Sequence, residues 1–136
     1  MRKCLFILLT ACLSAFTLLP NKVQLVRAGV TDTIELKGRE AVKFSEDVLF
    51  RVHNKDLRCN LAVYFQNKTL EGSGYVVLWA APDLTIMAEE FTYDERQEMV
   101  HFTSNVQVKT THTTAYATVS YNFKTNKIQN AVKATF

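Results

Sequence analysis

The sequence predicts an all-β protein of antiparallel strands in repeated hairpin units, packed as a sandwich or a slender jelly roll. A tyrosine precedes a polar turn three times, at Tyr64, Tyr93 and Tyr121, with spacings of 29 and then 28 residues. A fixed period of this kind indicates stacked supersecondary units that bury their apolar faces only against one another. Apolar and polar residues also alternate after Gly29, as they do in half-buried strands, and no segment there has convincing helical periodicity.

The first expected element is a leader. An apolar run over residues 4–19 follows a basic N-terminus, and Val26-Arg27-Ala28 supplies small residues at the positions that precede a signal-peptidase cut. We therefore expect a signal peptide over residues 1–28 and one exported β domain over residues 29–136.

Two other readings of the leader stay open. The apolar run is shorter than the ~20 residues of a membrane-spanning helix, which favours cleavage over a retained N-terminal anchor. Leu9-Thr10-Ala11-Cys12 matches a bacterial lipobox, which would leave a lipid on Cys12, although Cys12 lies early for that.

Charge and cysteine content describe an ordinary exported surface. All 13 Asp and Glu but only 12 of the 16 Lys and Arg follow Gly29, so no basic field for nucleic acid remains and no nucleic-acid partner is expected. Cys59 is the one cysteine outside the leader, which excludes an internal disulfide. It alternates with Leu57 and Leu61, so we expect a small buried hydrophobe.

Strands are expected from residue 33 onward. Residues 33–36, 41–44 and 48–52 read as three early strands, the first two joined by a turn over residues 37–40. Three hairpins follow, with strands over residues 57–63 and 70–78, 84–92 and 99–108, and 114–120 and 128–136. Their turns are expected at residues 66–68, 94–97 and 124–127. The total is roughly eight to ten antiparallel strands in two packed sheets.

The alternation is regular in some strands and changes phase in others. It is regular in two series, namely Leu57, Cys59, Leu61, Val63 and Phe65, and Ala115, Ala117, Val119, Tyr121 and Phe123. It shifts past Glu89-Glu90 and again at Ser104-Asn105, which predicts a β-bulge or corner at each place. Such corners would bend a strand from one sheet toward the other.

The last strand reaches the end of the chain without a capping helix or a charged tail. Such an edge leaves backbone N–H and C=O groups unpaired, which folds normally shield. Either another strand adds edge to edge, or a neighbouring segment of this chain covers the edge. The sequence favours neither.

Two stretches resemble a known family. Residues 83–94 are similar to the recurrent "D-x-x-I-x-A-D/E-x-L-x-Y-D" unit of OstA-like proteins, and residues 100–108 resemble their "a-x-F-x-G-N-V-x-V" unit. These are the LptA-like periplasmic proteins of lipopolysaccharide transport. The likeness spans residues 30–136. It departs from the pattern at Ser104, where the family has glycine, and in the last repeat, which lacks the Gly-Asn pair.

The resemblance implies a V-shaped jelly roll whose concave apolar interior holds acyl chains. It also implies edge-to-edge stacking, either with further copies or with other jelly-roll transport proteins. Each exposed CH₂ costs about 0.8 kcal/mol in water, so an apolar trough would shield a lipid without any chemistry. The candidate lining residues are Val76, Leu78, Ile86, Ala88, Phe91, Phe102, Val106 and Val108. For each one alone, an ordinary core position is the alternative.

Catalytic or metal-binding constellations are not expected, and neither is a cofactor. His53, His101 and His112 fall on different elements at spacings unlike a zinc site. Glu89 and Glu90 are neighbours, so on a regular strand they would point to opposite faces and make a poor acid/base pair. Trp79 is expected to plug the core rather than to line the mouth of a groove.

The sequence therefore predicts a non-enzymatic carrier that shields the acyl chains of lipopolysaccharide, or of a related lipid, during transport to the outer membrane. Two alternatives remain. One is a membrane-anchored member of the same superfamily that docks on an ABC transporter. The other is a secreted structural β-protein that assembles through its edges and binds no lipid.

Overall fold

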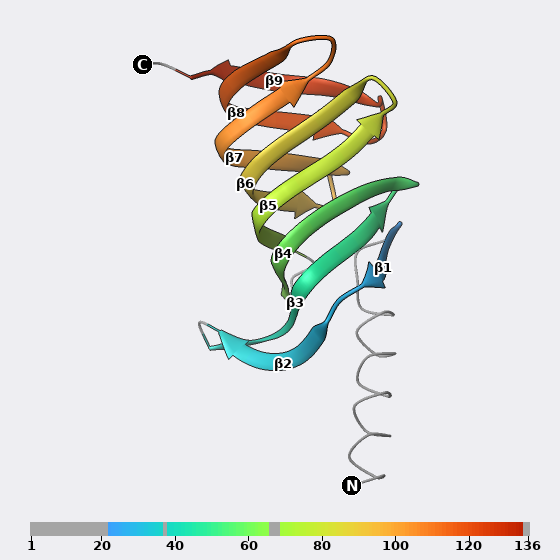
Figure 1. Cartoon of the computed structure of the whole chain (residues 1–136). Helices are drawn as coiled ribbons and strands as arrows, with labels where there is room; N and C mark the ends of the chain where they lie inside the picture. The colour runs from blue at the N-terminus through green and yellow to red at the C-terminus, as the bar shows by residue number, and fades with distance from the viewer. Residues whose placement is uncertain (1–21, 37, 66–68, 135–136) are drawn as a thin grey trace, which may run out of the picture.

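A computed structural model describes residues 22–36, 38–65 and 69–134, and these form nine antiparallel β-strands. They are β1 (Val23–Arg27), β2 (Val30–Leu36), β3 (Arg39–Val52), β4 (Lys55–Phe65), β5 (Thr69–Ala81), β6 (Leu84–Asp94), β7 (Met99–Lys109), β8 (Thr113–Asn122) and β9 (Lys127–Lys133). From β3 to β9 each strand pairs with the next in the chain, and successive strands stack from β2 at the bottom of Figure 1 to β9 at the top. The predicted all-β antiparallel class is confirmed.

The strands form one sheet, whereas the sequence suggested two. The ladder between β6 and β7 shifts register between Met87 and Glu90, and the ladder between β7 and β8 shifts between Thr103 and Val106. The bulges predicted at these two places are therefore confirmed. Similar shifts interrupt the other ladders from β3 to β9 near mid-strand. Since a bulge bends its strand, a row of them folds one continuous sheet into two facing halves.

Three of the bends share an unusual backbone. Glu46-Asp47, Gly74-Tyr75 and Ser104-Asn105 each place two consecutive residues at positive φ, between 48° and 80°. This left-handed region is disfavoured for residues other than glycine. Ser104, with φ 66°, stands where the resembling motif has glycine. The family's glycine thus suits the backbone of this corner.

Replacing Ser104 by glycine is expected to raise the free energy of unfolding by about 0.5–1 kcal/mol, because it relieves the left-handed strain. Urea denaturation measures the change. Thr103→Gly is the matched control, since Thr103 lies in the paired part of β7. This variant should lower the free energy of unfolding by about 0.5–1 kcal/mol instead. Equal losses in both variants would contradict the assignment of strain to Ser104.

The two halves of the sheet are told apart by their side chains. The tyrosine half contains Tyr64, Tyr93 and Tyr121, and its outer end carries the turns that follow Tyr93 and Tyr121. The opposite half contains Leu78, and the turn His53-Asn54 lies at its outer end. We call the side where the outer ends of the two halves approach each other the mouth.

Two series that the sequence presented as regular change phase at bulges. In β4, Leu57 and Cys59 are buried, but Ala62 and Tyr64 are then buried instead of Leu61. The ladder between β4 and β5 shifts register at this point. In β8 the same happens at Ala117, which is exposed together with Ala115. The prediction of one unbroken alternation was wrong at these sites, because a bulge exchanges the two faces of a strand.

The N-terminal edge consists of two short strands on one partner. β1 pairs with residues 49–52 of β3, and β2 pairs with residues 39–45, so together they make one further bent strand. The Gly29 N–H donates to the Glu46 carbonyl at this bend. The sheet thus begins before the boundary predicted at Gly29. The rest of the predicted leader, with Cys12, lies outside the described residues.

Other predicted elements differ in extent. The predicted strands at residues 41–44 and 48–52 are the two parts of the single strand β3. β9 ends at Lys133, and residues 135–136 lie outside the described chain, as does the turn predicted at residues 66–68. In the part of the chain that the structure describes, no helix has the length and hydropathy needed to cross a bilayer.

Candidate functional site

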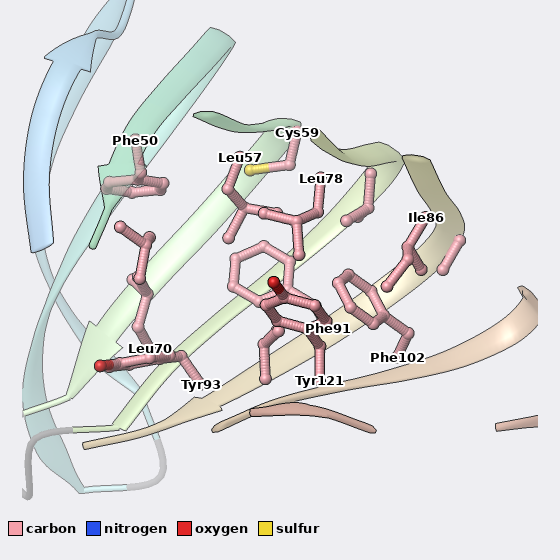
Figure 2. Close-up of a cluster of buried hydrophobic side chains, with 14 of the residues drawn as sticks. Phe50, Leu57, Cys59, Leu70, Leu78, Ile86, Phe91, Tyr93, Phe102 and Tyr121 are labelled. Atoms are coloured by element: carbon pink, nitrogen blue, oxygen red, sulfur yellow. The ribbon is translucent and has the colours of Figure 1, made fainter. Parts of the chain in front are cut away.

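The buried apolar side chains lie between the two halves and form one cluster. Figure 2 shows side chains from strands β3 to β8 directed into this shared space, namely Phe50, Leu57, Cys59, Leu70, Leu78, Ile86, Phe91, Tyr93, Phe102 and Tyr121. None of these ten side chains is more than 2% exposed. The fold therefore has one continuous apolar interior.

All eight predicted lining residues belong to this interior. Their exposed fractions lie between 0% and 7%, and every one is a member of the cluster. Six come from the opposite half, namely Val76, Leu78, Ile86, Ala88, Val106 and Val108. The tyrosine half contributes Phe91 and Phe102. The structure thus brings the eight side chains together in one interior, and their contact with a lipid stays a prediction.

Several interior residues were absent from the predicted lining. Tyr93 and Tyr121 flank Val100 in the ladder, and all three are buried on one face. In the sequence these tyrosines marked the repeat, and Tyr121 also belonged to a regular alternating series, but neither was proposed as a lining residue. Tyr93 follows Phe91 by two residues, and Tyr121 follows Val119 by two. This spacing was the signal that could have placed both tyrosines on the interior face.

A glycine makes room for one of the largest rings. Gly72 of β5 lies directly opposite Phe91 of β6. A Cβ atom on Gly72 would come within 2.0 Å of the Phe91 ring. The ring therefore lies over the glycine backbone, an arrangement that stabilises sheet glycines.

The interior is sealed in the middle strands and open toward β9. Residues directly opposite each other in a ladder share a face. Along one interior row Phe102 and Val119 are buried, while Ala131 of β9 is exposed. Along another row Val108 is buried, and Thr114 of β8 is exposed. Solvent thus reaches the interior face at this end of the sheet.

In the middle strands the side chains themselves occupy the interior. An alkyl chain could reach Ile86 or Phe102 there only if side chains moved or the two halves separated, since both are 0% exposed. Protein interiors are close-packed, so added volume requires such a displacement. The structure is therefore closed around the middle strands, and the interior face is exposed at the β8–β9 end.

Trp79 does not plug the core. Its exposed fraction is 45%, while its neighbours Leu78 and Ala80 are buried. Successive strand residues point to opposite faces, so burial of Leu78 directs Trp79 outward. The prediction that Trp79 is a core residue was wrong.

Four of the polar residues weighed for chemistry, namely His101, His112, Glu89 and Glu90, lie apart from the interior. His101 shares a hydrogen bond of 2.7 Å with Ser120, and His112 is exposed in a loop. Glu89 and Glu90 are both exposed, because the bulge at this point removes the regular alternation. Among the described residues no group of three or more His, Cys, Asp or Glu is placed to hold a metal ion.

Cys59 is a buried thiol, as its sequence pattern indicated. Its exposed fraction is 0%. Burial raises the pKa of this thiol to about 12, although a hydrogen bond with the backbone of Leu61 acts in the other direction. The nucleophilic thiolate is therefore scarce while the interior is closed.

Comparisons with known proteins agree with the fold. Residues 20–131 match the family described as OstA-like protein. No curated protein sequence matches the chain. The crystal structure of LptH from Pseudomonas aeruginosa, described as the LptA homologous periplasmic component of the conserved lipopolysaccharide transport device, superposes with a TM-score of 0.63. The two share 17% identity, and the match covers 82% of each chain.

Proposed function

Because this chain belongs to the OstA-like family, we propose that it is a non-enzymatic periplasmic carrier. In this proposal it shields the acyl chains of lipopolysaccharide, or of a related lipid, in its apolar interior during transport to the outer membrane. The observation that carries the proposal is the single interior cluster, which opens at the β8–β9 end of the sheet.

The energetics of lipid transfer support a carrier of this shape. Moving acyl chains through water costs about 0.8 kcal/mol for each exposed CH₂ group. An interior lined by aliphatic and aromatic side chains removes this cost by burial alone, without a catalytic group. The exposed row residues Thr114 and Ala131 mark where chains would first meet the interior face.

The free edges of the sheet suit edge-to-edge partners. Among the described residues β9 pairs only with β8, and Val132 on it is 57% exposed. At the other end, β1 and β2 pair with β3 alone within the part of the chain that the structure describes. Unpaired strand edges accept further strands. The partners we propose are a second copy of this chain or another jelly-roll transport protein, which would continue the interior from one unit into the next.

The proposal predicts lipid contact on one face of the open end. A photo-crosslinking amino acid at Thr114 is expected to capture lipid in cells, because this residue is exposed on the interior face. Ala115 is the matched control, since it is also exposed but points to the outer face. The same comparison is made one strand further from the open edge, with the photo-crosslinker at Val106 on the interior face and at Gln107 on the outer face as its control. Adducts are detected by immunoblotting for lipopolysaccharide.

Each result separates the proposal from its rivals. Adducts at Thr114 and Val106, without adducts at Ala115 and Gln107, support the carrier. Absence of lipid adducts at all four positions would favour the structural β-protein that binds no lipid. Sequencing the N-terminus of the exported protein then separates a periplasmic carrier from a membrane-anchored member of the family.

A further inference from the structure

The outer ends of the two halves are joined by one cluster of side chains at the mouth. His53 lies in the β3–β4 turn at the end of the opposite half, and Lys22 immediately precedes β1 beside it. Tyr93, Glu98 and Phe123 lie at the end of the tyrosine half. We call these five residues the latch.

His53 is the centre of the latch. Its ring stacks on the ring of Phe123, with centroids 4.9 Å apart and an interplanar angle of 9°. Its Nε2 atom lies 3.1 Å from the Tyr93 hydroxyl, within hydrogen-bonding distance. Only 11% of its side chain is exposed. The imidazole is thus held by an aromatic face and by a polar partner, both from the other half.

Glu98 provides the second connection. Its Oε1 atom accepts a hydrogen bond from Lys22 Nζ at 3.3 Å and lies 3.8 Å from His53 Nε2. The backbone ties each side together, since His53 N–H donates to the Lys22 carbonyl and Phe123 N–H donates to the Glu98 carbonyl. Each outer end is therefore held together by a backbone hydrogen bond, and the two ends contact each other through side chains.

Side-chain contacts of this kind can open without breaking the sheet. The hydrogen-bonded ladders run along the sheet within each half, so separating the outer ends at the mouth leaves them intact. Local opening of this sort costs less free energy than global unfolding. It would also uncover the interior of the middle strands, which the side chains seal in the closed form.

We infer that the latch of Lys22, His53, Tyr93, Glu98 and Phe123 is a gate that holds the two halves together and must release before an acyl chain reaches the middle of the interior. Its purpose rests on the proposed carrier function. Its mechanical part, control of access to the interior, does not depend on any lipid.

The charges around His53 give the gate a pH dependence. Burial lowers the pKa of His53 below 6.5, Lys22 and Lys55 lower it further, and Glu98 acts to raise it. Tyr93, whose own pKa is raised mainly by burial, contacts it as a neutral hydroxyl. A lowered pKa means that the closed form binds the proton less well than an open one. The latch is therefore at full strength above about pH 6.5 and weakens as the pH falls toward the lowered value.

Cys59 provides a lipid-free measure of opening. With Cys4 and Cys12 replaced by serine, Cys59 is the one remaining thiol, and it is 0% exposed in the closed form. A maleimide should label it slowly in the wild-type latch. His53→Ala is expected to raise the labelling rate by about tenfold, because local opening becomes more frequent. Lys22→Ala, at an exposed residue that leaves the core intact, should raise the rate by a smaller factor.

Two controls separate opening of the gate from loss of stability. Lys124 also pairs with Glu98, at 3.5 Å, but it lies at the same end as Glu98, so Lys124→Ala should leave the rate unchanged. Gly72→Ala destabilises the packing around Phe91 without touching the latch. In this variant the labelling rate of Cys59 should rise only through global unfolding, so it should depend steeply on the urea concentration. Equal labelling in His53→Ala, Lys124→Ala and wild type would overturn the latch.

The pH dependence is read as a ratio, which cancels the reagent's own response to pH. The labelling rate of His53→Gln divided by that of the wild type should be larger at pH 7.5 than at pH 5, since acid already weakens the wild-type latch. A ratio that does not change with pH would exclude titration of His53 from the gate.

A locked mouth tests the purpose of the gate. With Cys59 replaced by alanine in the same serine background, His53→Cys and Phe123→Cys can be joined by a bis-maleimide, and a photo-crosslinker at Val106 reports lipid. Adducts in the unlinked protein that disappear on linking support the gate. Adducts in both overturn it. Adducts in neither overturn the proposed carrier function, while the labelling of Cys59 still decides whether the latch exists.

Discussion

A chain that begins at Gly29 is expected to lose most of its stability relative to a chain that begins at Lys22. The shorter chain lacks β1, whose Val23 is 6% exposed and belongs to the interior cluster, with Leu25 packed against it. Burial of two aliphatic side chains contributes about 1.5–3 kcal/mol each, and each lost ladder hydrogen bond adds about 1 kcal/mol. The sum approaches the whole stability of a small domain, about 5–15 kcal/mol.

Removal of β1 also exposes the edge of β3. Phe50 and Val52 are both 0% exposed, and their backbone pairs with β1. Without that partner, an apolar strand edge is free to aggregate. Urea denaturation followed by far-ultraviolet circular dichroism compares the two chains, and sedimentation reports aggregation. Equal midpoints for the two chains would show that β1 is dispensable.

The result bears directly on export. A signal-peptidase cut before Gly29, as the sequence predicts, removes β1 from the sheet. If β1 is needed for stability, the mature chain starts before Val23. Mass spectrometry of the exported protein reads this terminus independently, and a mature start at Gly29 in a stable protein would contradict the expected role of β1.

Phe102→Ala is expected to lower the free energy of unfolding by about 3–5 kcal/mol. Phe102 is 0% exposed and lies in the interior row between Phe91 and Val119. Removing the ring deletes its buried area and leaves a cavity that neighbours anchored in two sheet halves fill only in part. Urea denaturation gives the difference from the midpoint and slope.

Thr103 gives the matched control, since it follows Phe102 on β7 but is exposed. Thr103→Ala should change the free energy of unfolding by no more than about 0.5 kcal/mol. A loss below 1 kcal/mol for Phe102→Ala would mean that the interior is loosely filled rather than packed. The closed form described above would then be wrong.

Much of the fold could be predicted because its signals are local. The repeated tyrosines, the alternation in β6 and the phase shifts at Glu89-Glu90 and Ser104-Asn105 lie within short windows of sequence. Each reports which side of a strand is apolar, and a stack of such strands has few ways to bury those sides. The predicted lining was found together for the same reason.

The errors fall where the local signal is ambiguous. Leu61 and Val63 continue the apolar alternation of Leu57, yet the register shift between Arg58 and Leu61 exchanges the faces and buries Ala62. Both phases of that stretch are apolar, so the pattern alone could not show the exchange. Trp79 is a similar case, because a large aromatic residue between two apolar neighbours reads as core.

By itself, the sequence determined the fold class, the hairpin repeat, the family resemblance and the apolar character of the interior. These properties follow from the order of residues along each strand, where the spacing of side chains is set by backbone geometry. Tertiary structure alone decided that one bent sheet replaces two, that β1 belongs to it, and that His53 meets Tyr93 and Phe123 at the mouth. Contacts between residues so far apart in the chain arise only when the bends bring the two halves together, and nothing in the local pattern encodes that meeting.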